Sequence, residues 1–168
     1  MAKQYTQITE MHKDFIVSQK IFFVGTATVD SRVNVSPKGM DSLRLIDDNR
    51  VIWLNLTGSG NETSAHVQES PRMTLMFCAF EGDPMILRLY GQAKVVHHSD
   101  KSWKDLISLF PSLPGARQIF DMQIDLVQAS CGMAVPFYDY AGDRNQLIDW
   151  AAKKKMMKLE ATGVRRIS

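Results

Sequence analysis

The stretch Ile21-Phe-Phe-Val-Gly-Thr-Ala-Thr-Val29 is followed by Asp30-Ser-Arg32 and then by Val33-Asn-Val-Ser36. β-Branched and aromatic residues dominate the first run, and such residues favour strands. The three polar residues that follow it are typical of a turn between two strands. The sequence therefore predicts an antiparallel hairpin over residues 21–36.

The rest of the chain repeats this hairpin pattern. Further strands are predicted at 43–46 and 51–56, at 72–80 and 85–97, and at 118–128. Helices are expected only at the margins, at 7–19, 61–70 and 100–110, and at the C-terminus. A parallel sheet would need a helix between successive strands, so six or seven strands in this order predict a mainly β, antiparallel barrel with peripheral helices.

Composition narrows the function classes. The 168 residues carry a net charge of only +2 and no long basic block, which argues against a nucleic-acid partner. No apolar run approaches a membrane span, and the N-terminus lacks the apolar centre of a signal peptide. Cys78 and Cys131 match no metal or redox spacing. We expect a single cytoplasmic domain over 1–168, with a C-terminal helix at about 143–160, no membrane partner and no metal.

The segment Thr57-Gly-Ser-Gly-Asn-Glu-Thr63 is the first candidate site. Its two glycines would let the backbone approach a ligand, and a short helix is expected to begin at Asn61. Free N–H groups and the helix dipole at such a start favour an anion. An ordinary capped loop remains the alternative. A second motif upstream, Asn34-Val-Ser-Pro-Lys-Gly39, adds the cation of Lys38, which could pair with a phosphate.

Four motifs in order carry a resemblance to a known family. They are Gly25-Thr-Ala-Thr-Val-Asp30, Val33-Asn-Val-Ser-Pro-Lys-Gly39, Thr57…Asn61-Glu-Thr63 and Leu87-Arg-Leu-Tyr-Gly91. Over roughly residues 10–130 the chain resembles the pyridoxamine 5′-phosphate oxidase-like, FMN-binding split-barrel family, and within it the small oxidase-related branch. The resemblance implies a six-stranded split barrel, a homodimer, and FMN held in a groove between the two subunits.

The resemblance also implies residue roles. By position, Ser36 and Lys38 would line the flavin, and Thr57, Asn61 and Thr63 would hold the ribityl phosphate. Arg88 falls where the family has a basic residue on the strand that faces the cofactor. Many relatives carry a lysine or arginine where this chain has Glu62 and Thr63. The loop therefore brings no cation, and Lys38 or Arg88 would have to compensate for it.

The function expected from these features is that of an FMN-dependent oxidoreductase acting on an unidentified small molecule. No side chain stands out as a catalytic acid or base, because a flavin carries the redox chemistry itself. Three alternatives stay open: a non-enzymatic flavin- or haem-binding protein for storage, sensing or stress, a deazaflavin in place of FMN, and a dimeric module without cofactor.

Three side chains outside the motifs carry expectations of their own. His66 is the histidine expected nearest to a bound cofactor. His12 is expected on the polar side of the first helix, whose apolar face is formed by Ile8, Met11, Phe15 and Ile16. Trp150 is expected to be an anchor in the core or at a dimer interface.

Overall fold

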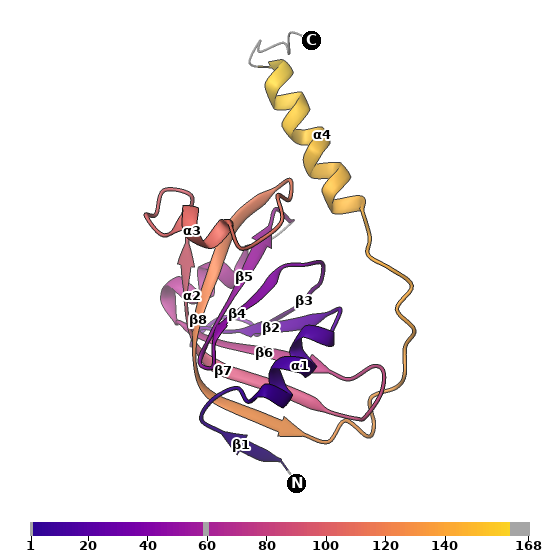
Figure 1. Cartoon of the computed structure of the whole chain (residues 1–168). Helices are drawn as coiled ribbons and strands as arrows, with labels where there is room; N and C mark the ends of the chain where they lie inside the picture. The colour runs from indigo at the N-terminus through magenta and orange to yellow at the C-terminus, as the bar shows by residue number, and fades with distance from the viewer. Residues whose placement is uncertain (1, 59–60, 162–168) are drawn as a thin grey trace.

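The computed structural model describes residues 2–58 and 61–161, so Ser59 and Gly60 of the predicted glycine loop and the tail 162–168 lie outside it. One antiparallel sheet dominates the molecule (Figure 1). Its strands are β1 (Lys3–Tyr5), β2 (Phe22–Thr26), β3 (Asn34–Lys38), β4 (Leu43–Asp47), β5 (Arg50–Leu56), β6 (Arg72–Cys78), β7 (Ile86–Val96) and β8 (Ala116–Ser130). The helices are α1 (Glu10–Ser18), α2 (Glu62–Glu69), α3 (Trp103–Ile107) and α4 (Gln146–Ala161).

The strand order is β3-β2-β6-β7-β8-β5-β4, with β1 paired to β8 outside this path. The mainly β, antiparallel prediction is confirmed, but the strand number was wrong: the sheet has eight strands and is not closed. The additional strand is β1, which forms because β8 is long enough to pair with two strands along one edge. One edge of β8 pairs along nearly all of β7, while the other edge is shared by β5 and, past Ile124, by β1.

The predicted hairpin over 21–36 forms as β2 and β3, and β3 continues to Lys38. This continuation passes through Pro37, which has no N–H to donate. The strand tolerates it because β3 lies at the end of the strand order, where one side needs no ladder partner.

The main core lies on one face of the sheet. Val24, Leu75, Leu89 and Val127 stand next to one another across β2, β6, β7 and β8, and all four are fully buried. Because side chains alternate between faces, their chain neighbours point to the opposite face. A second cluster, formed by β5, β8 and α3, contains Ile52, Leu54, Ile119, Trp103 and Leu106.

Helix α1 corrects an expectation. His12 is fully buried, whereas Met11 is 57% exposed. The buried row of this helix follows the spacing of four residues from Ile8 through His12 to Ile16. His12 also completes the N-terminal cap: Thr9 N donates to His12 Nδ1 at 3.3 Å, and His12 N donates to Thr9 Oγ1 at 3.4 Å.

The two later helices also differ from their predictions. α3 covers only Trp103–Ile107 of the expected 100–110, because Asp100 accepts a hydrogen bond from His97 N at 2.7 Å in the turn before it. α4 projects away from the sheet (Figure 1), and Trp150 is 46% exposed, so it is not a core anchor of this chain. Its place at a dimer interface stays a prediction. Within the described residues, no helix is both long and apolar enough to cross a membrane.

Candidate cofactor site

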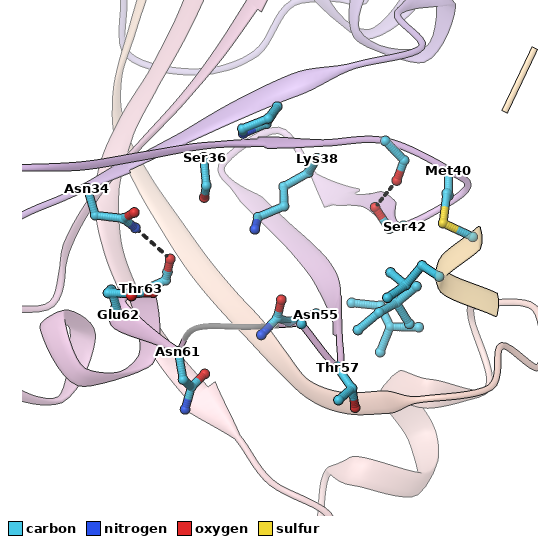
Figure 2. Close-up of a pocket in the computed structure, with 16 residues that line it drawn as sticks. Asn34, Ser36, Lys38, Met40, Ser42, Asn55, Thr57, Asn61, Glu62 and Thr63 are labelled. Atoms are coloured by element: carbon cyan, nitrogen blue, oxygen red, sulfur yellow. Dashed lines mark hydrogen bonds between the residues drawn. The ribbon is translucent and has the colours of Figure 1, made fainter. Parts of the chain in front are cut away.

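A cavity of about 320 Å³ lies between β3, the end of β5 and the start of α2 (Figure 2). Residues from four separate parts of the chain line it: Asn34, Ser36, Pro37, Lys38, Gly39, Met40, Ser42, Leu54, Asn55, Leu56, Thr57, Gly58, Asn61, Glu62, Thr63 and Leu147. Leu147 comes from α4. The volume is at the lower end of the range of small-molecule sites.

β3 supplies three polar side chains to one wall of this cavity. Asn34, Ser36 and Lys38 are alternate residues of the strand, so they face the same side. Lys38 Nζ lies 5.3 Å from the centroid of the Trp53 ring. Burial lowers the pKa of Lys38, and the nearby negative charge of Glu62 opposes this shift only in part. The ammonium group is therefore poorly solvated and would gain from a ligand with negative charge.

Ser36 presents an unsatisfied hydroxyl group. Ser36 Oγ is buried and has no hydrogen-bond partner among the described residues. Buried polar atoms nearly always have a hydrogen-bond partner, and a buried polar atom without one lowers the stability of the fold by about 1–3 kcal/mol. Figure 2 shows the Ser36 and Lys38 side chains directed into the space that Asn55 also faces. A polar ligand in the cavity would satisfy this hydroxyl.

The opposite wall is the start of α2. Asn61 precedes the helix, and its side chain makes no cap hydrogen bond to it. Asn61 Oδ1 instead accepts a hydrogen bond from Gln118 Nε2 at 2.8 Å, which fixes the amide and leaves its NH₂ group as a donor. The N–H groups of Ser64 and Ala65 donate to the carbonyl oxygen of Asn61, at 3.1 and 3.2 Å, whereas those of Glu62 and Thr63 precede the first helical acceptor. This wall therefore offers donors to an anion.

A buried network orients Thr63. Asn34 Nδ2 donates to Thr63 Oγ1 at 3.0 Å and lies 3.4 Å from Thr26 Oγ1. Thr26 Oγ1 is in turn 3.1 Å from His66 Nδ1. Because the Thr63 oxygen accepts from Asn34, its hydroxyl hydrogen is left to donate elsewhere. His66 thus supports the site from behind and does not line the cavity.

The structure brings five of the six predicted residues to one cavity: Ser36, Lys38, Thr57, Asn61 and Thr63. Their roles at a cofactor stay predictions. Thr57 has less to offer than expected, because its N–H and its hydroxyl both donate to the carbonyl oxygen of Gly115, at 2.7 and 3.0 Å.

Arg88 does not line the cavity. Its chain neighbours Leu87 and Leu89 are fully buried in the core, so Arg88 points to the outer face of the sheet. There Arg88 Nη1 donates to Ser130 Oγ at 3.2 Å. Among the described lining residues, Lys38 is the one cation and Glu62 the one carboxylate. A single chain therefore gives the cavity nearly balanced charge.

Several lining residues were missed by sequence reasoning. Asn34 and Asn55 could have been found. Asn34 lies two residues before Ser36 on the same face of β3, and Asn55 lies two residues before Thr57, where the glycine loop begins. Met40 lies in a left-handed conformation with φ of 61°, a strain that sequence does not reveal. Leu147 is more than eighty residues away along the chain and carries no local signal.

The sequence model of the pyridoxamine 5′-phosphate oxidase family matches residues 8–131 of this chain. The chain belongs to this family. A curated relative, the pyridoxamine 5′-phosphate oxidase family protein ustO of Aspergillus flavus, is 35% identical over 144 residues. This match covers 83% of the present chain but 58% of the relative, so the chain spans less than two thirds of that family member.

Solved structures of family members and other proteins share the fold. HupZ of Group A Streptococcus superposes with a TM-score of 0.60 at 19% identity, covering 73% of this chain and 99% of HupZ. An FMN-binding protein of Syntrophomonas wolfei gives a TM-score of 0.50 at 14% identity, covering 67% and 78%. HutZ, the haem storage protein of Vibrio cholerae, gives 0.53 at 15% identity, covering 76% and 97%. The fold is thus found in proteins named for flavin and for haem.

Proposed function

We propose that this protein binds FMN in the cavity between β3, β5 and α2, and that it is an FMN-dependent oxidoreductase for a small molecule. One observation carries the proposal: the unpartnered hydroxyl of Ser36 and the desolvated amine of Lys38 share a cavity with the start of α2. A polar, anionic cofactor would satisfy all three features at once. Membership of the family supports the choice of a flavin.

Different side chains would contact the ring and the phosphate of FMN. Ser36 and Lys38 would lie along the flavin ring, and Asn61 and Thr63 would donate hydrogen bonds to the phosphate. Once bound, FMN would supply reversible two-electron chemistry with hydride transfer. A positive charge on Lys38 would favour the reduced ring, which carries more negative charge.

The charge of the cavity suggests that a second chain takes part. A phosphate dianion would meet one lysine and the carboxylate of Glu62, so another cation is needed. In a homodimer, Arg88 on the outer face of one subunit would supply that cation to the cavity of the other. The outer face also carries Val35, which is 62% exposed, beside the half-buried Phe23 and Met76. Apolar side chains of this kind fit a subunit interface.

A haem-binding role has less support in this cavity. Haem iron is held by axial ligands such as histidine or cysteine. None of the described residues that line the cavity is a histidine or a cysteine. His98 lies elsewhere, with its ring centroid 3.9 Å from that of Trp103. The cavity therefore favours a flavin over haem.

The absorption spectrum of the purified protein tests the proposal, followed by titration of the apoprotein with FMN. Flavin absorption bands, or saturable quenching of FMN fluorescence, are expected. A colourless protein that leaves FMN fluorescence unchanged would overturn the assignment, and a Soret band would indicate haem instead. A competing titration with a deazaflavin decides between the two flavin types. Photoreduction followed by fast reoxidation with a candidate acceptor then separates an enzyme from a storage protein.

A further inference from the structure

Lys38 combines two properties that ordinary surface lysines lack. Its side chain lines a partly open cavity, and no carboxylate of the described residues lies within 4.0 Å of its Nζ. We propose that Lys38 is a nucleophilic amine that forms a reversible imine with a small aldehyde that carries a carboxylate. This site shares the cavity proposed for the flavin, but the imine does not require flavin to be bound.

Burial favours the neutral form of the Lys38 amine, and the negative charge of Glu62 opposes this effect only in part. Burial lowers the pKa of Lys38, which raises the fraction of the uncharged, nucleophilic amine near neutral pH. Lys13 shows the contrast within the same chain. Its Nζ lies 2.6 Å from Glu10 and 2.7 Å from Asp48, and hydrogen bonds to Asp48 and Glu10 raise its pKa. Two carboxylates stabilise the ammonium form of Lys13, whereas burial disfavours that form at Lys38.

Ser36 provides a hydroxyl that would assist imine formation by donating to the carbonyl oxygen. It lies two residues before Lys38 on the same face of β3, and Figure 2 shows both side chains directed into the cavity. Its buried oxygen has no partner among the described residues, so the hydroxyl is free to donate to a carbonyl oxygen. An aldehyde carbon near Lys38 would place its oxygen within the reach of this donor.

The wall opposite β3, at the start of α2, would bind the anionic group of the aldehyde. The free N–H groups at the start of α2, which line the same cavity as Ser36 and Lys38, would hold an anion. Glu62 also lines the cavity, and its negative charge counts against a dianion. A monoanionic carboxylate therefore fits this wall better than a phosphate when one chain acts alone.

The chemistry balances without an added oxidant or reductant. The lone pair of Lys38 Nζ attacks the aldehyde carbon and forms a C–N bond, while the carbonyl oxygen takes up a proton that the amine gives up. The resulting carbinolamine loses its hydroxyl group with a second proton from nitrogen as water, and a C=N bond remains. Hydrolysis reverses both steps, so the adduct is transient unless it is reduced.

Reductive trapping tests the proposal on the whole purified chain. The protein is incubated with glyoxylate and sodium cyanoborohydride near neutral pH, and the alkylated lysines are located by mass spectrometry of peptides. We expect Lys38 to be labelled several-fold faster than the exposed Lys101 in the same sample, with a rate that saturates as glyoxylate increases. Acetaldehyde, which lacks the carboxylate, should label Lys38 without saturation.

Two variants and one competitor complete the test. Lys38→Arg should abolish labelling of this peptide and leave Lys101 unchanged, and Ser36→Ala should slow labelling of Lys38 several-fold. Labelling of Lys38 no faster than Lys101, or equal labelling in Ser36→Ala, would overturn the proposal. Added FMN should protect Lys38. Labelling that proceeds normally but is not slowed by FMN would count against the flavin site alone, so the two proposals can fail separately.

Discussion

Lys38 and Arg88, the two cations expected to meet the same cofactor, lie on opposite faces of the sheet. The register shows this: Ser36, on the same face as Lys38, stands beside Val24, and Val24 continues through Leu75 to Leu89. Arg88 precedes Leu89 and therefore points the other way. Within one chain the cavity contains Lys38 but not Arg88.

Substitution of the cavity donors should weaken flavin binding. Lys38→Ala removes the one lysine of the cavity, and Asn61→Ala removes an amide fixed by Gln118. Loss of a hydrogen bond to a charged group costs about 1.5–3 kcal/mol, so each change should lower FMN affinity more than about tenfold. Fluorescence titration measures this, with the exposed Lys101→Ala as control. Unchanged affinity in both cavity variants would mean that FMN does not bind in this cavity in the proposed way.

A buried ion pair should make stability depend on pH. Arg50 Nε and Nη2 donate to the two carboxylate oxygens of Asp121 at 2.8 and 3.0 Å. Burial alone would raise the pKa of Asp121, but the hydrogen bonds and charges of Arg50 and Lys94 outweigh it and leave the pKa lowered. A carboxyl group with a lowered pKa stabilises the fold above its unfolded pKa, and this contribution is lost as the pH falls through the folded pKa.

Asp121→Asn should therefore cost about 2 kcal/mol of unfolding free energy at neutral pH, below the cost for a fully buried pair because Arg50 remains one-third exposed. Urea denaturation at several pH values measures it. The difference from the natural protein should shrink in acid, where the carboxylate is protonated. Asp125→Asn, exposed on the same strand, is the control and should change little. A difference that persists unchanged in acid would contradict the ion-pair explanation.

The hairpins were predictable because their information is local. Alternating apolar residues and the turns between them lie within a few positions of each other, so β2 with β3, β4 with β5 and β6 with β7 follow from the sequence. β1 is different. Three residues, Lys3–Tyr5, form a strand only because the free edge of distant β8 accepts them.

Only those parts of the site whose residues are close in sequence could be predicted. Ser36 and Lys38 share a strand, and Asn61 and Thr63 share a turn, so each pair could be placed together. The face of Arg88 relative to that of Lys38 depends on the registers of β2, β6 and β7, which no local pattern contains. His12 was misjudged for a similar reason. Tyr5 of β1 helps to bury His12, and the centroids of the two rings lie 4.7 Å apart.

Two glycines offer a matched test of how α4 is held at the cavity. Gly115 and Gly82 both have left-handed φ, of 81° and 68°. A Cβ at Gly115 would lie 3.0 Å from Ala151 Cβ of α4, whereas a Cβ at Gly82 would meet nothing within 4 Å. Alanine at either position should cost about 1–2 kcal/mol for the backbone conformation.

Gly115→Ala alone should also displace α4, because Ala151 is buried against this position. We expect faster amide hydrogen exchange in residues 146–151 and weaker FMN binding, since Leu147 lines the cavity. Gly82→Ala should lose stability without either effect. Equal hydrogen exchange in α4 of the two variants would show that this contact does not hold the helix.

Mixing two variants that bind FMN weakly tests whether Arg88 of one subunit completes the cavity of the other. Arg88→Ala should weaken FMN binding more than about tenfold although Arg88 lies outside the cavity of its own chain. In a mixed dimer of Lys38→Ala and Arg88→Ala chains, one site loses both cations and the other keeps both. Random mixing should therefore restore tight FMN binding at about one quarter of all sites. Stoichiometric titration of the remixed protein measures this fraction. If no tight sites return, while each variant still forms dimers in gel filtration, Arg88 does not complete the partner's site, and the second cation of the phosphate must come from another residue.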